Sequence, residues 1–123
     1  MKVTIAGIRR KIVIAIAALA LLGANAHATT FTCQGQISRS IIYGNGNLMI
    51  VASWRGSYTQ LCNIHQEWLG ISAEVCRSWH AMIESAKARQ ANTLVQYTDA
   101  NFTCSTLPTY GASIKPNYLI TDD

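Results

Sequence analysis

Phe31, Cys33, Gly35 and Ile37 fall on alternate positions of the chain, followed by Ile41 and Tyr43, and this is the period of a β-strand. Between Phe31 and Tyr43 the alternation is sustained and β-branched and aromatic residues are frequent, so we predict one long first strand. Gly35 or the Ser38–Ser40 region is the expected place of a bend or bulge. Gly44-Asn45-Gly46-Asn47 then predicts a tight hairpin turn, because an Asn-Gly pair accepts positive φ angles.

Two more strands are expected before the pattern changes. Leu48–Trp54 predicts a second strand, Arg55-Gly56-Ser57 a second turn, and Tyr58–Ile64 a third strand. The segment His65–Ile71 has no regular period, so we expect an irregular connection there.

An amphipathic helix is predicted next. Ser72 is suited to cap a helix that begins at Ala73, and Glu74 in its first turn is favoured by the helix dipole. Apolar residues at helical spacing form one stripe as far as about Gln90: Val75, Cys76, Trp79, Met82, Ile83 and Ala86. Arg77, His80, Glu84 and Lys87 fall on the opposite side.

After the helix we expect a strand at Thr93–Tyr97, a turn at Thr98–Asn101, a loop at Phe102–Asn117 and a short strand at Tyr118–Thr121. The predicted order is therefore β-β-β-α-β-β, a mainly β domain with one α-helix. This order is that of the five-stranded oligonucleotide/oligosaccharide-binding (OB) barrel. The alternative is an α+β arrangement in which the helix packs on an antiparallel sheet.

Residues 1–28 have the order of regions found in a secretory signal peptide. Four cations precede an apolar run, Ile12–Leu22, and the cations are Lys2, Arg9, Arg10 and Lys11. Ala26-His27-Ala28 is a small-x-small cleavage site, so we expect cleavage after Ala28 and a single domain over residues 29–123. The apolar run is too short for a membrane span, and a buried N-terminal helix would have no use for the cations. We therefore expect a periplasmic or secreted protein with no membrane span after cleavage.

The charge of the whole chain, ten Lys and Arg against six Asp and Glu, changes when the signal is removed. Four of the ten cations lie in residues 1–28, so the mature chain has six cations and six acids. A nearly neutral domain lacks the clustered cations that nucleic acid binding requires, and we expect no nucleic acid partner.

All four cysteines lie in the mature part, and an even number in a small exported domain indicates disulfides. Of the three pairings, we favour Cys33–Cys104, which joins the two ends of the domain, and Cys62–Cys76, which closes a short loop from a strand to the helix. A metal site is the rival interpretation, but no pair has the two-residue spacing of a zinc knuckle, and no cofactor is expected.

The layout resembles the B subunits of bacterial enterotoxins of the cholera and subtilase-cytotoxin type. The shared features are a signal peptide, an N-terminal cysteine (Cys33), a long helix after three strands, and a cysteine after the fourth strand (Cys104). This resemblance implies an exported OB-fold protein that forms rings and binds cell-surface glycans. Cys33 and Cys104 lie where that family has the disulfide that joins the two ends of the domain, whereas Cys62 and Cys76 are additional to the cholera-type pattern. No residue of this chain matches a known sugar-binding residue of the family. The segment from Cys76-Arg77-Ser78-Trp79 through Cys104–Tyr110 also resembles a group of short exported proteobacterial proteins of no settled function.

Catalytic motifs are not found in the sequence. There is no phosphate-binding Gly-Lys-Ser/Thr loop, no Gly-x-Ser-x-Gly elbow and no His-Glu-x-x-His. His80 and Glu84, four residues apart on the polar side of the predicted helix, form a typical surface pair. We therefore expect no enzymatic activity.

The candidate ligand-binding residues are aromatic and polar side chains near the second hairpin and in the connections. Aromatic faces stack on sugars and anchor protein interfaces, and Arg and Ser donate hydrogen bonds. These residues are Trp54, Arg55, Ser57, Tyr58, Trp68 and Tyr110. The competing interpretation is that Trp54 and Trp68 belong to the core.

The sequence favours a non-catalytic, toxin-B-subunit-like binding module that recognises a glycan or protein on a cell surface. The partners implied are that ligand, further copies of the chain in a homo-oligomeric ring, and a catalytic A-type subunit. The alternative is a periplasmic inhibitor or immunity-type protein that blocks a secreted enzyme.

Overall fold

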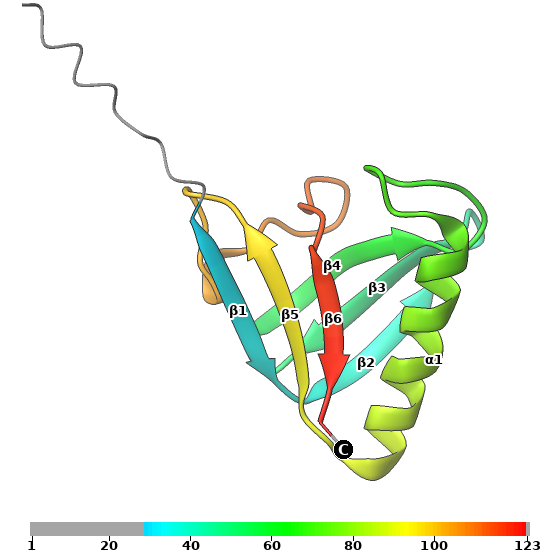
Figure 1. The fold of residues 1–123 in the computed structure, drawn as a ribbon, viewed down its shortest axis with the longest axis horizontal. Helices are drawn as coiled ribbons and strands as arrows, with labels where there is room; N and C mark the ends of the chain where they lie inside the picture. Colours follow the sequence, from blue (N-terminus) through cyan, green and yellow to red (C-terminus); the bar gives the residue numbers. More distant parts are fainter. Residues whose placement is uncertain (1–28, 123) are drawn as a thin grey trace, which may run out of the picture.

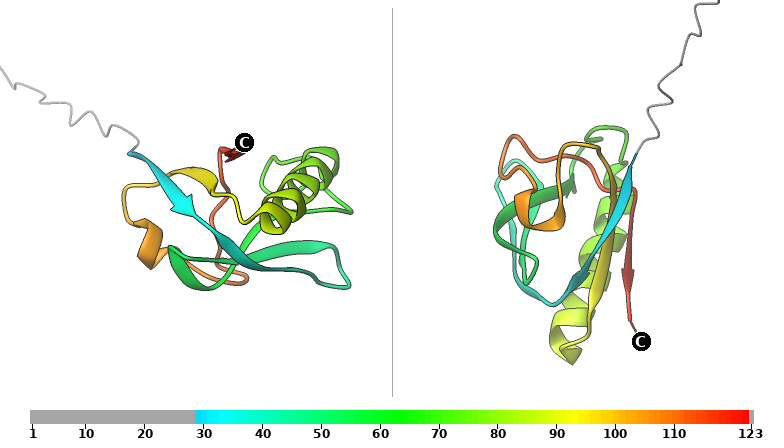
Figure 2. Two further views of the ribbon diagram at one scale, coloured as in Figure 1. Left: turned by 90° about the horizontal axis from the view of Figure 1, so that it is seen from below. Right: turned by 90° about the vertical axis from the view of Figure 1, so that its left-hand side faces the viewer.

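The strands of the protein form two three-stranded antiparallel sheets, with one helix packed beside them (Figure 1). The computed structural model describes residues 29–122, so the predicted signal peptide lies outside the described residues. One sheet has the order β1 (Thr30–Gly35), β5 (Thr93–Thr98), β6 (Tyr118–Thr121). The other has the order β2 (Ile37–Ile42), β3 (Asn47–Ala52), β4 (Arg55–Asn63). Figure 2 shows the two sheets as separate layers.

The predicted long first strand is present but divided at Gln36, so that β1 enters one sheet and β2 the other. A methyl group at Gly35 would meet the Ser53 side chain and lie 3.4 Å from the Trp54 ring. Any residue with a side chain at position 35 would collide with Ser53, so the bend requires glycine there. A register shift between Ile37 and Arg39 adds a bulge, so both predicted places of irregularity are confirmed.

The first hairpin is confirmed and the second is displaced. Gly46, at φ 95°, donates its N–H to the Tyr43 carbonyl oxygen at 2.8 Å and closes the turn between β2 and β3. The predicted turn at Arg55-Gly56-Ser57 is wrong, because Ala52 pairs with Arg55 and the turn consists of Ser53 and Trp54. Gly56 lies inside β4 and has open space around it. Neither a turn nor a close approach therefore requires glycine at this position, and its presence was a misleading turn signal.

The helix α1 (Ala73–Arg89) begins as predicted: the Ser72 hydroxyl accepts a hydrogen bond from the Val75 N–H at 3.2 Å. It ends at Gln90, which has a left-handed conformation. The predicted stripe is narrower than expected, since Val75 is 42% exposed and Met82 is partly buried. The buried residues of α1 are Cys76, Trp79, Ile83 and Ala86. They place α1 against β2 and β4 of one sheet and β6 of the other.

The core fills the space enclosed by the two sheets and α1. Its largest fully buried side chains include Leu48, Ile50, Leu61, Ile83 and Tyr97. A closed five-stranded barrel is not seen in residues 29–122, because β4 and β6 are not paired. The long loop that precedes β6 instead makes one isolated parallel bridge to β4, between Thr59 and Tyr110. Residues 29–122 are thus mainly β, with one α-helix and two antiparallel sheets.

Both disulfides have the favoured pairing. Cys33–Cys104 links β1 to the short 3₁₀ helix η1 (Cys104–Thr106), across 71 positions of the chain. Cys62–Cys76 links β4 to α1 across 14 positions, and both of its cysteines are fully buried. No helix within residues 29–122 is long and apolar enough to cross a membrane.

Candidate functional site

The candidate site is built on the first half of β4, where the strand is only partly covered. Arg55, Ser57 and Tyr58 are half-buried there, whereas every residue from Thr59 to Asn63 is buried. Alternation along a strand sends successive side chains to opposite faces, so full burial of the second half means that both of its faces are covered. The first half lacks the cover of α1 and remains open to a partner.

The loop after η1 folds back along this first half. Leu107 is 1% exposed and anchors the loop in the core, and its carbonyl oxygen accepts a hydrogen bond from Arg55 Nε at 3.0 Å. The Tyr110 N–H then donates to the Tyr58 carbonyl oxygen at 3.0 Å. Three residues later the buried Ser113 hydroxyl accepts from the Gln60 N–H at 2.8 Å. These bonds fix residues 107–113 to β4 at three points.

The result is a pair of tyrosines from distant parts of the chain. The rings of Tyr58 and Tyr110 have centroids 6.0 Å apart and planes inclined by 56°, within the range of favourable aromatic pairs. Tyr110 is 46% exposed and has a positive φ of 52°, an unfavourable conformation for a residue with a side chain. Backbone strain of this kind persists where surrounding structure enforces it, and it is often found at binding sites. We call Tyr58, Tyr110, Arg55 and Ser57 the tyrosine site.

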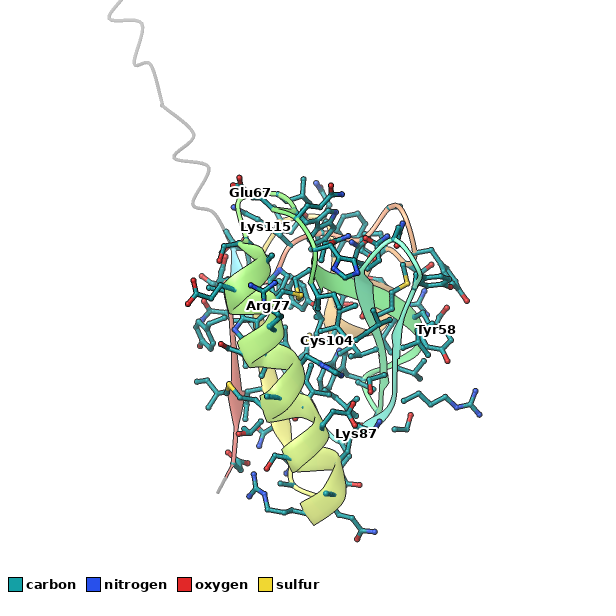
Figure 3. The ribbon with its side chains drawn as sticks, turned by 90° about the vertical axis from the view of Figure 1, so that its right-hand side faces the viewer. Tyr58, Glu67, Arg77, Lys87, Cys104 and Lys115 are labelled. Carbon is teal, nitrogen blue, oxygen red and sulfur yellow. A yellow bond between two sulfur atoms is a disulfide. The ribbon has the colours of Figure 1, made fainter. Side chains whose placement is uncertain are left out.

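Figure 3 places Tyr58 on the side of the molecule away from α1. The helix therefore does not cover this ring.

The two tryptophans do not join the tyrosine site. Trp54 lies at the β3–β4 turn against Gly35, and Trp68 lies in the connection before α1, where it exchanges two backbone hydrogen bonds with Ile71. Both are partly buried and pack on the core. The ring pairs of the described residues are Phe31–Tyr97 and Tyr58–Tyr110, so neither tryptophan stacks on a tyrosine.

Sequence reasoning did not find an open pocket of about 440 Å³ between the connection before α1 and the loops around β5 and β6. Its lining residues are Leu69, Thr98, Asp99, Ser113, Ile114 and Lys115. These positions share no period or motif, because three separate loops supply them. Within residues 29–122, no group of three His, Cys, Asp or Glu residues is arranged to hold a metal ion.

A polar cluster joins α1 to β2 on another face. The Ser40 hydroxyl donates to Glu84 Oε1, Lys87 Nζ donates to the Ser40 hydroxyl at 2.9 Å, and His80 Nε2 lies 3.6 Å from Glu84 Oε1. The hydrogen bond from Ser40 lowers the pKa of the Glu84 carboxyl, and the nearby Lys87 ammonium lowers it further. Through these contacts the cluster ties α1 to β2.

Comparisons with protein-family models, with curated proteins and with solved structures found no match to this chain.

Proposed function

We propose that this chain is an exported, non-catalytic binding module that recognises a glycan or a protein on a cell surface through the tyrosine site. The observation that carries the proposal is the close pairing of Tyr58 and Tyr110, on a part of β4 that α1 does not cover and next to the loop that Arg55 holds through the Leu107 carbonyl oxygen. Tyrosine offers a large contact area with little conformational freedom to lose, and arginine supplies directed donors to hydroxyl or carbonyl oxygens. Residues 107–113 are fixed by hydrogen bonds, so little ordering is needed on binding.

We propose further that the fold is OB-like and related in layout to the toxin B subunits. The order of elements supports this: β1 and β2 together correspond to one long bent first strand, β3 and β4 follow, and α1 precedes β5 and β6. The two disulfides, Cys33–Cys104 and Cys62–Cys76, are compatible with a periplasmic or secreted location. On this proposal, copies of the chain form a ring that carries a catalytic A-type subunit, and residues 1–28 are removed during export.

The proposal is tested with the mature protein, residues 29–123, by light scattering after size-exclusion chromatography and then by a glycan array. Tyr110→Ala should weaken binding to any recognised glycan at least tenfold, about 1.4 kcal/mol, as expected for an exposed aromatic ring that a ligand buries on binding. The matched control is Tyr43→Ala, since Tyr43 is 43% exposed against 46% for Tyr110 and lies in the β2–β3 turn. This control should bind as the unchanged protein does.

A strictly monomeric protein that binds no glycan would contradict the toxin-B-like form of the proposal. If that protein instead inhibits a secreted cell-wall hydrolase, the inhibitor alternative replaces it. Loss of such inhibition in Tyr110→Ala would still assign recognition to the tyrosine site.

A further inference from the structure

The loop between β5 and η1 contains a sequence that oligosaccharyltransferases recognise. Asn101-Phe102-Thr103 has the form Asn-x-Thr, in which the residue after asparagine is not proline. Of the seven asparagines in the chain, Asn101 alone is followed by Ser or Thr two positions later. Some bacterial transferases also require an acid two positions before the asparagine, and Asp99 occupies that position. The five residues therefore satisfy both forms of the acceptor requirement.

The structure presents this segment at the surface. Residues 99–103 have no regular secondary structure, and both Asn101 and Thr103 are exposed. The Asp99 carboxylate accepts a hydrogen bond from the Asn101 N–H at 2.7 Å, which turns the backbone at the acceptor. Within the described part of the chain, the Asn101 carboxamide makes no hydrogen bond to another residue, so none has to break when it reacts.

From these observations we infer that Asn101 is a site of N-linked glycosylation, and that the donor is an oligosaccharide carried on a polyprenyl pyrophosphate lipid. In the reaction Asn101 Nδ2 forms a bond to the anomeric carbon of the first sugar. The bond between that carbon and the pyrophosphate oxygen breaks, and the lipid pyrophosphate leaves. The amide nitrogen loses one proton to the transferase, and no oxidation or reduction occurs. This inference depends on export of the chain and not on the tyrosine site.

The fold limits when the transfer takes place. The Thr103 hydroxyl, which the transferase must reach, lies 3.0 Å from the Thr106 hydroxyl and 3.3 Å from that of Ser105. Cys104, the next residue, is tied to Cys33. Closure of this disulfide holds the segment in its folded turn, so glycosylation is most efficient before the disulfide forms. A glycan at Asn101 stands beside the open pocket, since Thr98 and Asp99 line that pocket.

To test this inference, the full chain, residues 1–123, is expressed in bacteria that carry a transferase requiring an acid two positions before the asparagine. The same bacteria make the lipid-linked oligosaccharide that this transferase uses. An established acceptor protein in the same cells serves as the positive control. Intact mass should show a fraction of the exported chain heavier by one glycan, and peptide mapping should place that mass on Asn101. Removal of the disulfide with Cys33→Ala and Cys104→Ala should raise the glycosylated fraction.

The variants separate the sequence requirement from folding. Asn101→Gln, Thr103→Val and Asp99→Asn should carry no glycan, Thr103→Ser should retain it, and the control Asn117→Gln should be glycosylated as the unchanged chain is. With a transferase that reads only Asn-x-Thr, Asp99→Asn should again be modified. The inference is overturned if the exported chain gains no mass while the positive control is modified, if the glycan maps to another residue, or if the chain stays in the cytoplasm.

Discussion

The two halves of β4 show how one strand supports recognition at one end and stability at the other. From Thr59 to Asn63 every residue is buried, with α1 joined to the strand through Cys62–Cys76. From Arg55 to Tyr58 the residues are half-buried or exposed, and the cover is a loop held by a few hydrogen bonds. A loop leaves side chains more accessible than a packed helix does, and the pair of half-buried Tyr58 and exposed Tyr110 lies at this half of the strand.

The polar contacts of the two halves differ as well. Asn63, 1% exposed, donates to the Asn45 carbonyl oxygen and to Asn47 Oδ1, and accepts from the N–H groups of His65 and Gln66. In the first half, Ser57 makes no side-chain hydrogen bond within residues 29–122. We therefore expect substitutions in the second half to reduce stability, and those in the first half to reduce binding.

The largest expected effect is the loss of Cys33–Cys104, which holds the loop over the first half. Replacing both cysteines by alanine should lower the free energy of unfolding by about 4 kcal/mol, because the disulfide closes a loop of 71 positions in the unfolded chain. Urea unfolding measures this change. Ligand binding should weaken too, since Tyr110 then belongs to a looser loop.

The matched control removes Cys62–Cys76, whose 14-position loop predicts a loss of about 3 kcal/mol. Binding should be retained under conditions in which this variant is folded. Equal loss of binding in both variants would mean that the two halves of β4 are not independent.

The next effect is that of Asn63→Ala. Removing a buried side chain with four hydrogen bonds should cost about 2–3 kcal/mol, because it leaves backbone donors and acceptors unpaired. The control Ser57→Ala should cost less than about 0.5 kcal/mol, as for an ordinary surface substitution. Both changes in the free energy of unfolding are measured from the midpoints of urea unfolding curves whose slope, the m-value, is unchanged. If Ser57→Ala proved as costly as Asn63→Ala, the division of β4 into a binding half and a stability half would be wrong.

Arg55→Ala should have a smaller effect on stability, about 1 kcal/mol for one hydrogen bond to a carbonyl oxygen. Its effect on binding should be greater, because Arg55 Nε holds the Leu107 carbonyl oxygen and so positions the loop that carries Tyr110. Arg55→Lys keeps the charge but not the donor geometry. If binding depends on positioning, lysine should restore little of it, whereas full recovery would indicate a charge effect alone.

Local patterns predicted the parts of the molecule that depend on neighbouring residues. The Ser72 cap and the spacing of Trp79 and Ile83 are sufficient to define α1, and the Gly-Asn-Gly turn defines the first hairpin. The bend at Gly35 was expected, but its consequence was not. The chain passes from one sheet to the other where the space beside Gly35 is occupied by Ser53 and Trp54, which no alternation of residues reveals.

The candidate site was only partly predictable for the same reason. Tyr58 and Tyr110 were both selected as aromatic residues near turns, but their pairing depends on the bridge between Thr59 and Tyr110, which joins distant parts of the chain. Trp54 and Trp68 meet the same criterion, but both pack against the core and neither pairs with a tyrosine ring. Side-chain type indicates what a residue can bind, whereas burial is decided by packing between elements.

The smallest effect is expected outside β4, at the tie between α1 and β2. The hydrogen bond from Ser40 lowers the pKa of Glu84 from its ordinary value of 4.5, so the ionised carboxylate stabilises the folded state. This contribution is fully present above pH 4.5 and is lost as the pH falls through the lowered pKa. Because the side chain is 47% exposed, Glu84→Gln should cost only a few tenths of a kcal/mol at pH 7. The difference from the unchanged protein should diminish as the pH is lowered from 7 to below 4.5, as measured by urea unfolding at pH 7 and at an acidic pH. A cost that stays the same at both pH values would show that Glu84 acts through packing, and a cost as large as that of Asn63→Ala would place a second centre of stability at this tie.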